Sequence, residues 1–155
     1  MAKLKIIRNT YDTFDALKNV FAYVMVGAKS NGYIGAQNML LSNISEQLNA
    51  ANDYYYNTTR KKVIHFIIAF APDDYISPAD AFKEGYNICK LLPEYQITFS
   101  VHQNTDNLHM HFAMNPISLY NGHKFYFDNK NLYTFAAGIR KIFEPYDIKI
   151  SCISE

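Results

Sequence analysis

The sequence predicts an α+β fold in which a mostly antiparallel central sheet carries helices packed on its apolar faces. Short strand-like segments alternate with amphipathic helical segments, and no repeat, low-complexity stretch or Pro/Gly-rich linker interrupts them. Two strand-like segments within residues 97–115 are joined by a short polar turn, which indicates a hairpin and therefore antiparallel pairing. With 155 residues, 49% of them hydrophobic, the chain can bury a core as one domain, 1–155.

The first half of the chain is expected to contain a strand, two helices and a loop between the helices. The strand is expected at Leu4–Arg8, the first helix at Thr13–Met25, the loop around Gly27, Gly32 and Gly35, and the second helix at Ser45–Tyr56. The first helix follows from apolar residues that recur at helical spacing after a capping Asp12 or Thr13. On this helix Tyr23 lies about 110° from the centre of the apolar stripe, so it flanks the side that faces the core.

The second half is expected to begin with a buried central strand. The run KKVIHFIIAF, Lys61–Phe70, is too short and too rich in β-branched residues for a helix. A helix then begins with Ser77 as its cap and Pro78 at its first position, and it stops at Pro93. The remaining elements are two strands at Gln96–His102 and Leu108–Asn115 and a last amphipathic helix at Asn131–Phe143.

Charge and composition restrict the class of protein. The net charge of +1 is weak for a nucleic-acid binder, although basic residues gather at 3–8, 60–62 and 140–141, which is compatible with a local positive groove. The two cysteines, Cys89 and Cys152, lack CxxC spacing and are expected to be reduced thiols. No apolar run approaches the length of a membrane span, so we expect a cytoplasmic protein without a membrane segment.

The segment ITFSVHQNTDNLHMHFAMN, Ile97–Asn115, is the most informative part of the sequence. Its centre, NTDN, consists of residues that favour turns, because their short polar side chains bond to the local backbone. If Gln103 and Leu108 close the turn, three cross-strand pairs are apolar: Val101 with Met110, Phe99 with Phe112, and Ile97 with Met114. This apolar face fixes the pairing register of the hairpin independently of its polar residues.

The opposite face of the hairpin then carries three of the five histidines of the chain. His102 lies across from His109, and His111 follows His109 on the same side, which brings three imidazoles together. A lone HxH pair is more often the wet side of a strand, but a third histidine in a fixed register favours a metal site with open coordination positions. The other two histidines, His65 and His123, are expected to be structural or peripheral.

The pattern HxxxDxxHxH, formed by His102, Asp106, His109 and His111, resembles the third motif of the mobilisation relaxases in the HUH endonuclease superfamily. The flanking segments VIHFIIAFAPDDYISPADAFKEGYNICKLL and NGHKFYFDNKNLYTFAAGIRKIFEPYDI look like the stretches on either side of that motif. With the N-terminal helix, the resemblance covers nearly the whole chain, and it implies an HUH-endonuclease fold.

The resemblance also implies a reaction and its residues. Relaxases of this kind place a nucleophilic tyrosine near the end of the first helix, where this chain has Tyr23. The expected reaction nicks single-stranded DNA at the transfer origin of a plasmid or mobile element, through a 5′-phosphotyrosyl link. A divalent ion, Mg²⁺ or Mn²⁺, held by His102, His109 and His111 would polarise the phosphate, and Asp106 would orient a ligand or assist deprotonation. Other transfer-machinery proteins are expected partners.

Several alternatives stay open at this stage. Tyr33 or, more remotely, Tyr11 would be the nucleophile if Tyr23 is only a packed helical tyrosine. A replication initiator or transposase of the same superfamily would use a tyrosine after the histidines, here Tyr133. A non-catalytic DNA-binding accessory protein with this fold would need neither a metal nor a nucleophile. The cluster Tyr54–Tyr56 would either stack on bases or fold onto the core.

Overall fold

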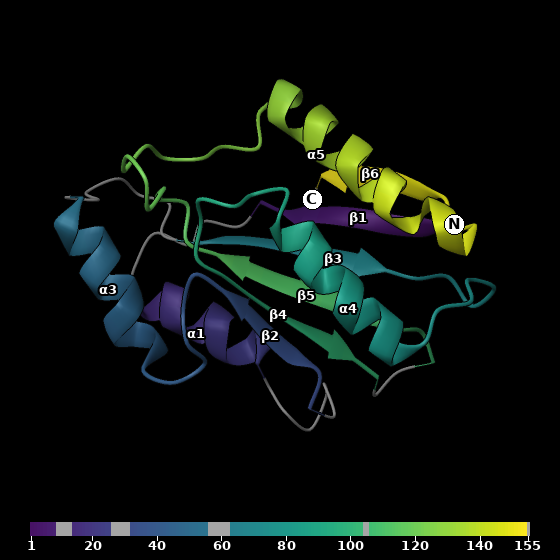
Figure 1. Cartoon of the computed structure of the whole chain (residues 1–155), viewed down its shortest axis with the longest axis horizontal. Coiled ribbons are helices and arrows are strands. Elements are labelled where there is room, and N and C mark those ends of the chain that lie inside the picture. Colours follow the sequence, from purple (N-terminus) through teal and green to yellow (C-terminus); the bar gives the residue numbers. More distant parts are fainter. Residues whose placement is uncertain (9–13, 26–31, 56–62, 104–105, 155) are drawn as a thin grey trace.

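A six-stranded sheet of order β2-β4-β5-β3-β1-β6 organises the chain (Figure 1). Its strands are β1 (Ala2–Ile7), β2 (Ile34–Gln37), β3 (Ile64–Ala69), β4 (Ile97–His102), β5 (His109–Met114) and β6 (Ile150–Ser154). All neighbouring strands are antiparallel except β1 and β6, which run parallel. The computed structural model describes residues 1–8, 14–25, 32–55, 63–103 and 106–154. The predicted α+β class with a mostly antiparallel sheet is confirmed.

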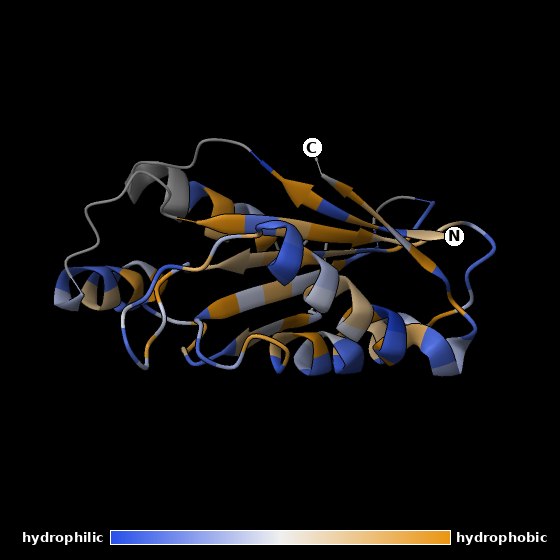
Figure 2. Cartoon of the chain, turned by 90° about the horizontal axis from the view of Figure 1, so that it is seen from above, coloured by the Kyte–Doolittle hydropathy of each residue, from blue (hydrophilic) through white to orange (hydrophobic). Residues whose placement is uncertain are grey.

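The helices lie on both sides of this sheet (Figures 1 and 2). They are α1 (Phe14–Val24), α3 (Ile44–Tyr54), α4 (Pro78–Cys89) and α5 (Asn129–Phe143), with a short 3-10 turn at Glu144–Tyr146. Helices α4 and α5 cover one face, whereas α1 packs on β4 and β5 from the opposite side, with α3 beside it. None of the helices in these ranges is both long and apolar enough to cross a bilayer.

Side-chain caps explain where α4 and α5, the two helices on the core side of the sheet, begin. Ser77 has extended backbone geometry, and its hydroxyl accepts a hydrogen bond from the Asp80 amide at 3.0 Å, with Pro78 in the first turn. Asp128 does the same for α5, because its carboxylate accepts from the Asn131 amide at 2.8 Å. The predicted start of the first of these helices at Ser77 is confirmed.

The core lies between the sheet and the pair α4 and α5. Phe112 of β5 stacks on Phe66 of β3 at 4.6 Å between ring centroids, and Phe99 of β4 stacks on its other side at 5.5 Å. Phe135 of α5 meets Phe66 edge-on, which locks the helix to the sheet. These aromatic residues are almost completely buried, so this side of the sheet provides most of the apolar burial that stabilises the fold.

The predicted register of the histidine hairpin is confirmed. The structure pairs Val101 with Met110, Phe99 with Phe112, Ile97 with Met114, and His102 with His109. The apolar residues of these pairs belong to the core on the side covered by α4 and α5. Since side chains alternate along a strand, His102, His109 and His111 must emerge on the opposite side, which we call the histidine face.

Two strands were not predicted. Residues 34–37 fall in the expected glycine loop, but they form the edge strand β2, which pairs with β4. Gly35 permits this pairing, because a Cβ there would lie 2.5 Å from the ring of Phe99 and 2.9 Å from the hydroxyl of Tyr86. The strand β6 follows α5 and pairs in parallel with β1.

The other elements match the predicted order, with ends shifted by a few residues. The first strand begins at Ala2 rather than Leu4, and the central strand β3 begins at Ile64 rather than Lys61. The predicted caps Asp12 and Thr13 lie outside the described residues, as do Tyr11 and Tyr56.

Candidate active site

The imidazoles of β4 and β5 gather on the histidine face. The rings of His102 and His111 stack with centroids 4.1 Å apart and planes at 24°. The ring of His109 lies 6.3 Å from that of His111, at 41°. His102 and His111 are buried, whereas His109 is half-buried. The hairpin therefore brings all three predicted histidines into one cluster.

A fourth imidazole, that of His65, joins the cluster from β3. The register pairs Ile67 with His111, so His65 lies diagonally beside His111 on the same face. The Nε2 atom of His65 is 3.4 Å from Nδ1 of His111, and the ring centroids are 5.7 Å apart. His65 was expected to be structural or peripheral, and the structure places it inside the cluster rather than at its periphery. Burial, and then the nearby charge of His102, lower the pKa of His65 to about 4, so this ring is neutral near pH 7.

Tyr23, near the end of α1, lies over three of these rings. Its ring centroid is 5.6 Å from that of His111, 6.2 Å from that of His102 and 6.3 Å from that of His65, each time in an edge-on arrangement. Its side chain is 44% exposed, so a substrate can reach it. The predicted nucleophile and the predicted histidines thus lie at one place, although they are far apart in sequence.

A small second core holds α1 at this position. Val20, Phe21 and Val24 pack with Leu48 of α3 and with Ala113 of β5. Tyr23 flanks this buried stripe rather than belonging to it, and its ring contacts the imidazoles. The apolar stripe therefore fixes the helix, and the flanking position predicted for Tyr23 places it over the imidazoles.

Ser100 connects the end of α1 to His102. The Ser100 hydroxyl donates to the Val24 carbonyl, and the Ser100 oxygen lies 2.9 Å from His102 Nε2. Because the single hydroxyl proton is used on Val24, the oxygen must accept from His102, so Nε2 of His102 carries a proton. The same Nε2 is 3.3 Å from the Val24 carbonyl. The end of the helix that bears Tyr23 is thus tied to the histidine cluster.

The donor set suits a divalent ion in type, but the rings do not converge. Three imidazoles on one strand pair are ligands that many divalent ions accept. Among the described residues, however, no group of three or more His, Cys, Asp or Glu side chains is arranged to hold an ion. His102 Nε2 and His111 Nδ1 face other protein groups, an outer interaction that ligand histidines commonly make through the nitrogen that does not bind metal. The residues fit an ion in chemistry and strand position, but the present orientation of their rings does not form a metal-holding group.

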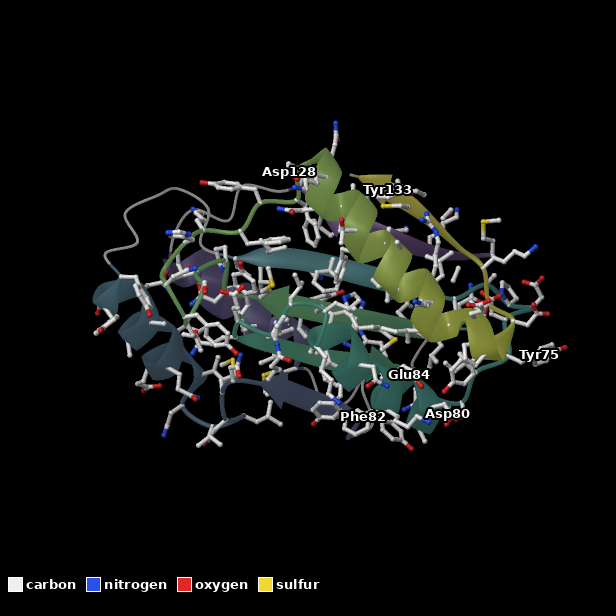
Figure 3. All side chains as sticks on the ribbon, turned by 45° about the horizontal axis from the view of Figure 1, so that its top comes forward. Tyr75, Asp80, Phe82, Glu84, Asp128 and Tyr133 are labelled. Carbon is white, nitrogen blue, oxygen red and sulfur yellow. The ribbon has the colours of Figure 1, made fainter. Side chains whose placement is uncertain are left out.

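The other predicted residues lie elsewhere. Asp106 is exposed at the turn, and no hydrogen bond within the described ranges joins it to a histidine. Tyr33 packs against Phe82 of α4, on the side of the sheet covered by α4 and α5. Tyr133 is 75% exposed on α5, also on that side (Figure 3). Of the tyrosines proposed as nucleophiles and described by the structure, Tyr23 alone contacts the histidines.

Sequence reasoning missed His65 and Ser100 as members of this site. Ser100 sits between His102 and Thr98 on the histidine face, so the hairpin register already placed it there. The place of His65 could be predicted only from the register between β3 and β5, which no local sequence pattern provides. The expected peripheral place of His123 agrees with its exposure in the loop before α5.

A comparison with protein-family models identifies one family for this arrangement. The model described as "Relaxase: MobA/VirD2-like, nuclease domain" matches residues 23–148. The match begins at Tyr23 and includes the histidine hairpin and α5. No curated protein matches the chain at a significant level. Nuclease domains of this family nick DNA and are generally metal-dependent.

Proposed function

Because the chain belongs to the MobA/VirD2-like relaxase nuclease-domain family, we propose that it nicks single-stranded DNA with Tyr23 as the nucleophile. The site of nicking would be the transfer origin of a plasmid or other mobile element. The observation that carries this proposal is the position of the Tyr23 ring, within 5.6 to 6.3 Å of three imidazole rings on the face opposite to the main core. An exposed phenol beside buried imidazoles combines an accessible nucleophile with fixed polar groups.

The proposed step is a transesterification at phosphorus. The Tyr23 oxygen forms a bond to the phosphorus, the bond from phosphorus to the 3′ oxygen breaks, and the downstream strand stays attached through its 5′ phosphate. The phenolic proton leaves to a base, and the 3′ oxygen takes up a proton to become a hydroxyl. One phosphodiester bond replaces another, so the reverse step rejoins the strand without a nucleotide cofactor.

His102, His109 and His111 are the residues that would hold a divalent ion, Mg²⁺ or Mn²⁺. When bound, such an ion would neutralise charge on the phosphate oxygens and favour attack by a phenol, which is a weak nucleophile while protonated. His65 supports the ligand His111, because a neutral imidazole can accept the Nδ1 proton of His111 and leave its Nε2 lone pair available. Asp106 keeps its proposed role of orienting a ligand or accepting a proton.

A covalent-adduct assay tests the nucleophile and the polarity of the link together. The protein is incubated with Mn²⁺ and a pool of single-stranded oligonucleotides, labelled at the 3′ end in one reaction and at the 5′ end in another. We expect a labelled protein band on a denaturing gel only with the 3′ label, because the downstream fragment stays on the protein. The 5′ label should move with a shorter free fragment that ends in a hydroxyl.

Two matched variants complete this assay. Tyr23→Phe keeps the ring and removes the nucleophilic oxygen, so it should abolish the adduct, whereas Tyr133→Phe should leave it intact. Peptide mapping of the adduct should identify Tyr23. If Tyr133→Phe abolishes the adduct and Tyr23→Phe does not, the initiator-like or transposase-like reading replaces ours.

Metal binding is tested apart from cutting. Titration of the metal-free protein with Mn²⁺, followed by electron paramagnetic resonance of the free ion, should show one site. His109→Ala and His111→Ala should weaken binding by at least about tenfold, whereas His123→Ala, at an exposed histidine of the loop before α5, should not. Equal binding by all variants would place the ion elsewhere.

A non-catalytic accessory role is the second candidate, and one observation favours it: the described histidines do not converge into a metal-holding group. Under that reading the protein would bind single-stranded DNA or another transfer-machinery protein, would take up no ion, and would form no adduct. Adduct formation by the wild-type protein rejects it.

A further inference from the structure

The histidine face continues beyond the histidines, across β3, β1 and β6. The pairing registers place residues in two rows perpendicular to the strands. One row runs through Ser100, His111, Ile67, Lys5 and Ile153, and the other through His102, His109, Ala69, Lys3 and Ser151. Each row begins at the candidate active site and passes over a lysine of β1 before it reaches the edge of the sheet.

This part of the face is less covered than the rest of the sheet. On β1, Leu4 and Ile6 point into the core and are 0% and 2% exposed, whereas Lys3 is exposed and Lys5 is half-buried. Ile67 of β3 is half-buried as well, between two fully buried neighbours. Figure 2 shows α1 over one end of this side, and no described helix lies over the remainder. Lys3, Lys5 and Ile67 are therefore at least partly accessible on this side of the described structure.

Within the described strands of this surface, the fully charged side chains are lysines. Lys3 and Lys5 both emerge on the histidine face, and none of β1, β3, β5 and β6 contains an Asp or Glu. Neighbouring strands are about 4.8 Å apart, so β1 lies about 10 Å from β5 and its lysines can reach phosphates next to one held at the histidines. The half-buried Ile67 between the two strands offers an apolar contact for a sugar or a base.

We propose that the rows across β3 and β1 form a binding surface for the single strand on one side of the scissile phosphate, with Lys3 and Lys5 as its phosphate contacts. This inference rests on the proposed function, because it takes the DNA substrate and the position of cutting from it. It assigns substrate-positioning residues that the histidine motif and Tyr23 do not include. A protein of net charge +1 would then bind a polyanion through a local patch rather than through its overall charge.

Binding without cutting tests this proposal. Fluorescence anisotropy of a fluorescein-labelled, mixed-sequence single-stranded oligonucleotide is measured in EDTA over a series of salt concentrations. The double variant Lys3→Gln/Lys5→Gln should bind roughly tenfold more weakly than wild type at low salt. The slope of log K against log salt should fall by about 1.4, because each lost phosphate contact removes about 0.7 for a single strand.

A charge-matched control removes two lysines from elsewhere. Lys141→Gln/Lys149→Gln changes the net charge equally, at exposed residues of α5 and of the segment before β6, and should stay within about twofold of wild type. Equal losses in both double variants, or no loss in Lys3→Gln/Lys5→Gln, overturn the proposal. Both variants should melt at the wild-type temperature, since the substituted side chains lie outside the core.

The adduct assay separates this inference from the proposed function. Lys3→Gln/Lys5→Gln should require more DNA for half-maximal adduct formation while the maximal rate stays near that of wild type. Tyr23→Phe should show the opposite behaviour, with unchanged anisotropy and no adduct. If Tyr23→Phe still forms the adduct, the proposed nucleophile fails even where the lysine result holds; if adduct forms normally but the lysines do not affect binding, only the binding surface fails.

Discussion

The two faces of the same sheet differ in what their side chains do. On the face covered by α4 and α5, Phe66, Phe99 and Phe112 are completely buried and stack on one another. On the other face, α1 covers one end, and the histidines, Ile67 and the lysines of β1 are buried to different degrees. Alternate residues of a single strand therefore provide core packing on one side and the residues of the proposed chemistry on the other. Substitutions at neighbouring positions should separate the two roles.

The largest effect is expected from a pair of adjacent residues on β5. Phe112→Ala removes a ring from the centre of the core and should lower the free energy of unfolding by about 4 kcal/mol. His111→Ala, one position earlier, should lower it by about 1 to 2 kcal/mol, clearly less than Phe112→Ala, while adduct formation is lost. Urea unfolding followed by circular dichroism, with the adduct assay in parallel, measures both. A large stability loss in His111→Ala would break the comparison.

The pH dependence of stability tests the buried imidazole of β3. Folding lowers the pKa of His65 from 6.5 to about 4, so the unfolded chain takes up a proton before the folded one does. The stability of the metal-free protein should therefore be lost as pH falls from about 6.5 to about 4, by up to about 3 kcal/mol from this group. In His65→Gln, measured in EDTA, this part of the pH dependence should be absent. Parallel profiles for the two proteins would contradict the assignment.

Alanine substitutions at two helical glycines test how tightly the face under α4 and α5 is packed. A Cβ on Gly85 of α4 would lie 2.2 Å from the fully buried ring of Phe99, which cannot move, so Gly85→Ala should cost about 2 kcal/mol despite alanine's better helix propensity. At Gly138 of α5 the obstacles are the methyl groups of the partly exposed Leu91, at 2.9 Å. Gly138→Ala should be neutral or slightly stabilising. Thermal unfolding of both variants tests the contrast.

The smallest effect is expected at the edge of the covered face, where α4 meets the turn after α5. The Tyr146 hydroxyl donates to Glu84 at 2.9 Å, and burial, then this carboxylate, raise the pKa of Tyr146 to about 12. Tyr146→Phe should cost about 1 kcal/mol at neutral pH. Since the folded pKa is raised, this advantage of wild type is present below pH 10 and is lost as pH rises toward 12. Tyr75→Phe, at a residue that is 87% exposed, is the control.

Much of this arrangement could be predicted from local patterns. The hairpin register follows from three apolar pairs, and this register alone places His102, His109 and His111 on one face. The start of α4 followed from the Ser-Pro sequence at 77 and 78. The flanking position of Tyr23 on its helix was also readable, because the apolar stripe fixes which side of α1 is buried.

What could not be predicted depends on contacts between distant segments. The role of His65 follows from the pairing of β3 with β5, and a single histidine in an apolar run contains no information about its neighbour across the sheet. The edge strand β2 was hidden because its glycine, which serves close packing against Phe99, reads locally as a loop residue. Which ring nitrogen faces which neighbour depends on the tautomer and the hydrogen-bond partners of each histidine, and residue spacing determines neither.

The parallel pairing of β1 with β6 has a consequence for how the molecule forms. Ala2 donates its amide to the carbonyl of Lys149, so two strands separated by nearly all the other elements of this fold are hydrogen-bonded neighbours. On the ribosome β1 cannot gain this neighbour until residues near 150 have emerged, whereas the histidine hairpin can close soon after it is made. During translation the nascent chain should therefore form the histidine hairpin early and complete the pairing of the lysine-bearing strand β1 late.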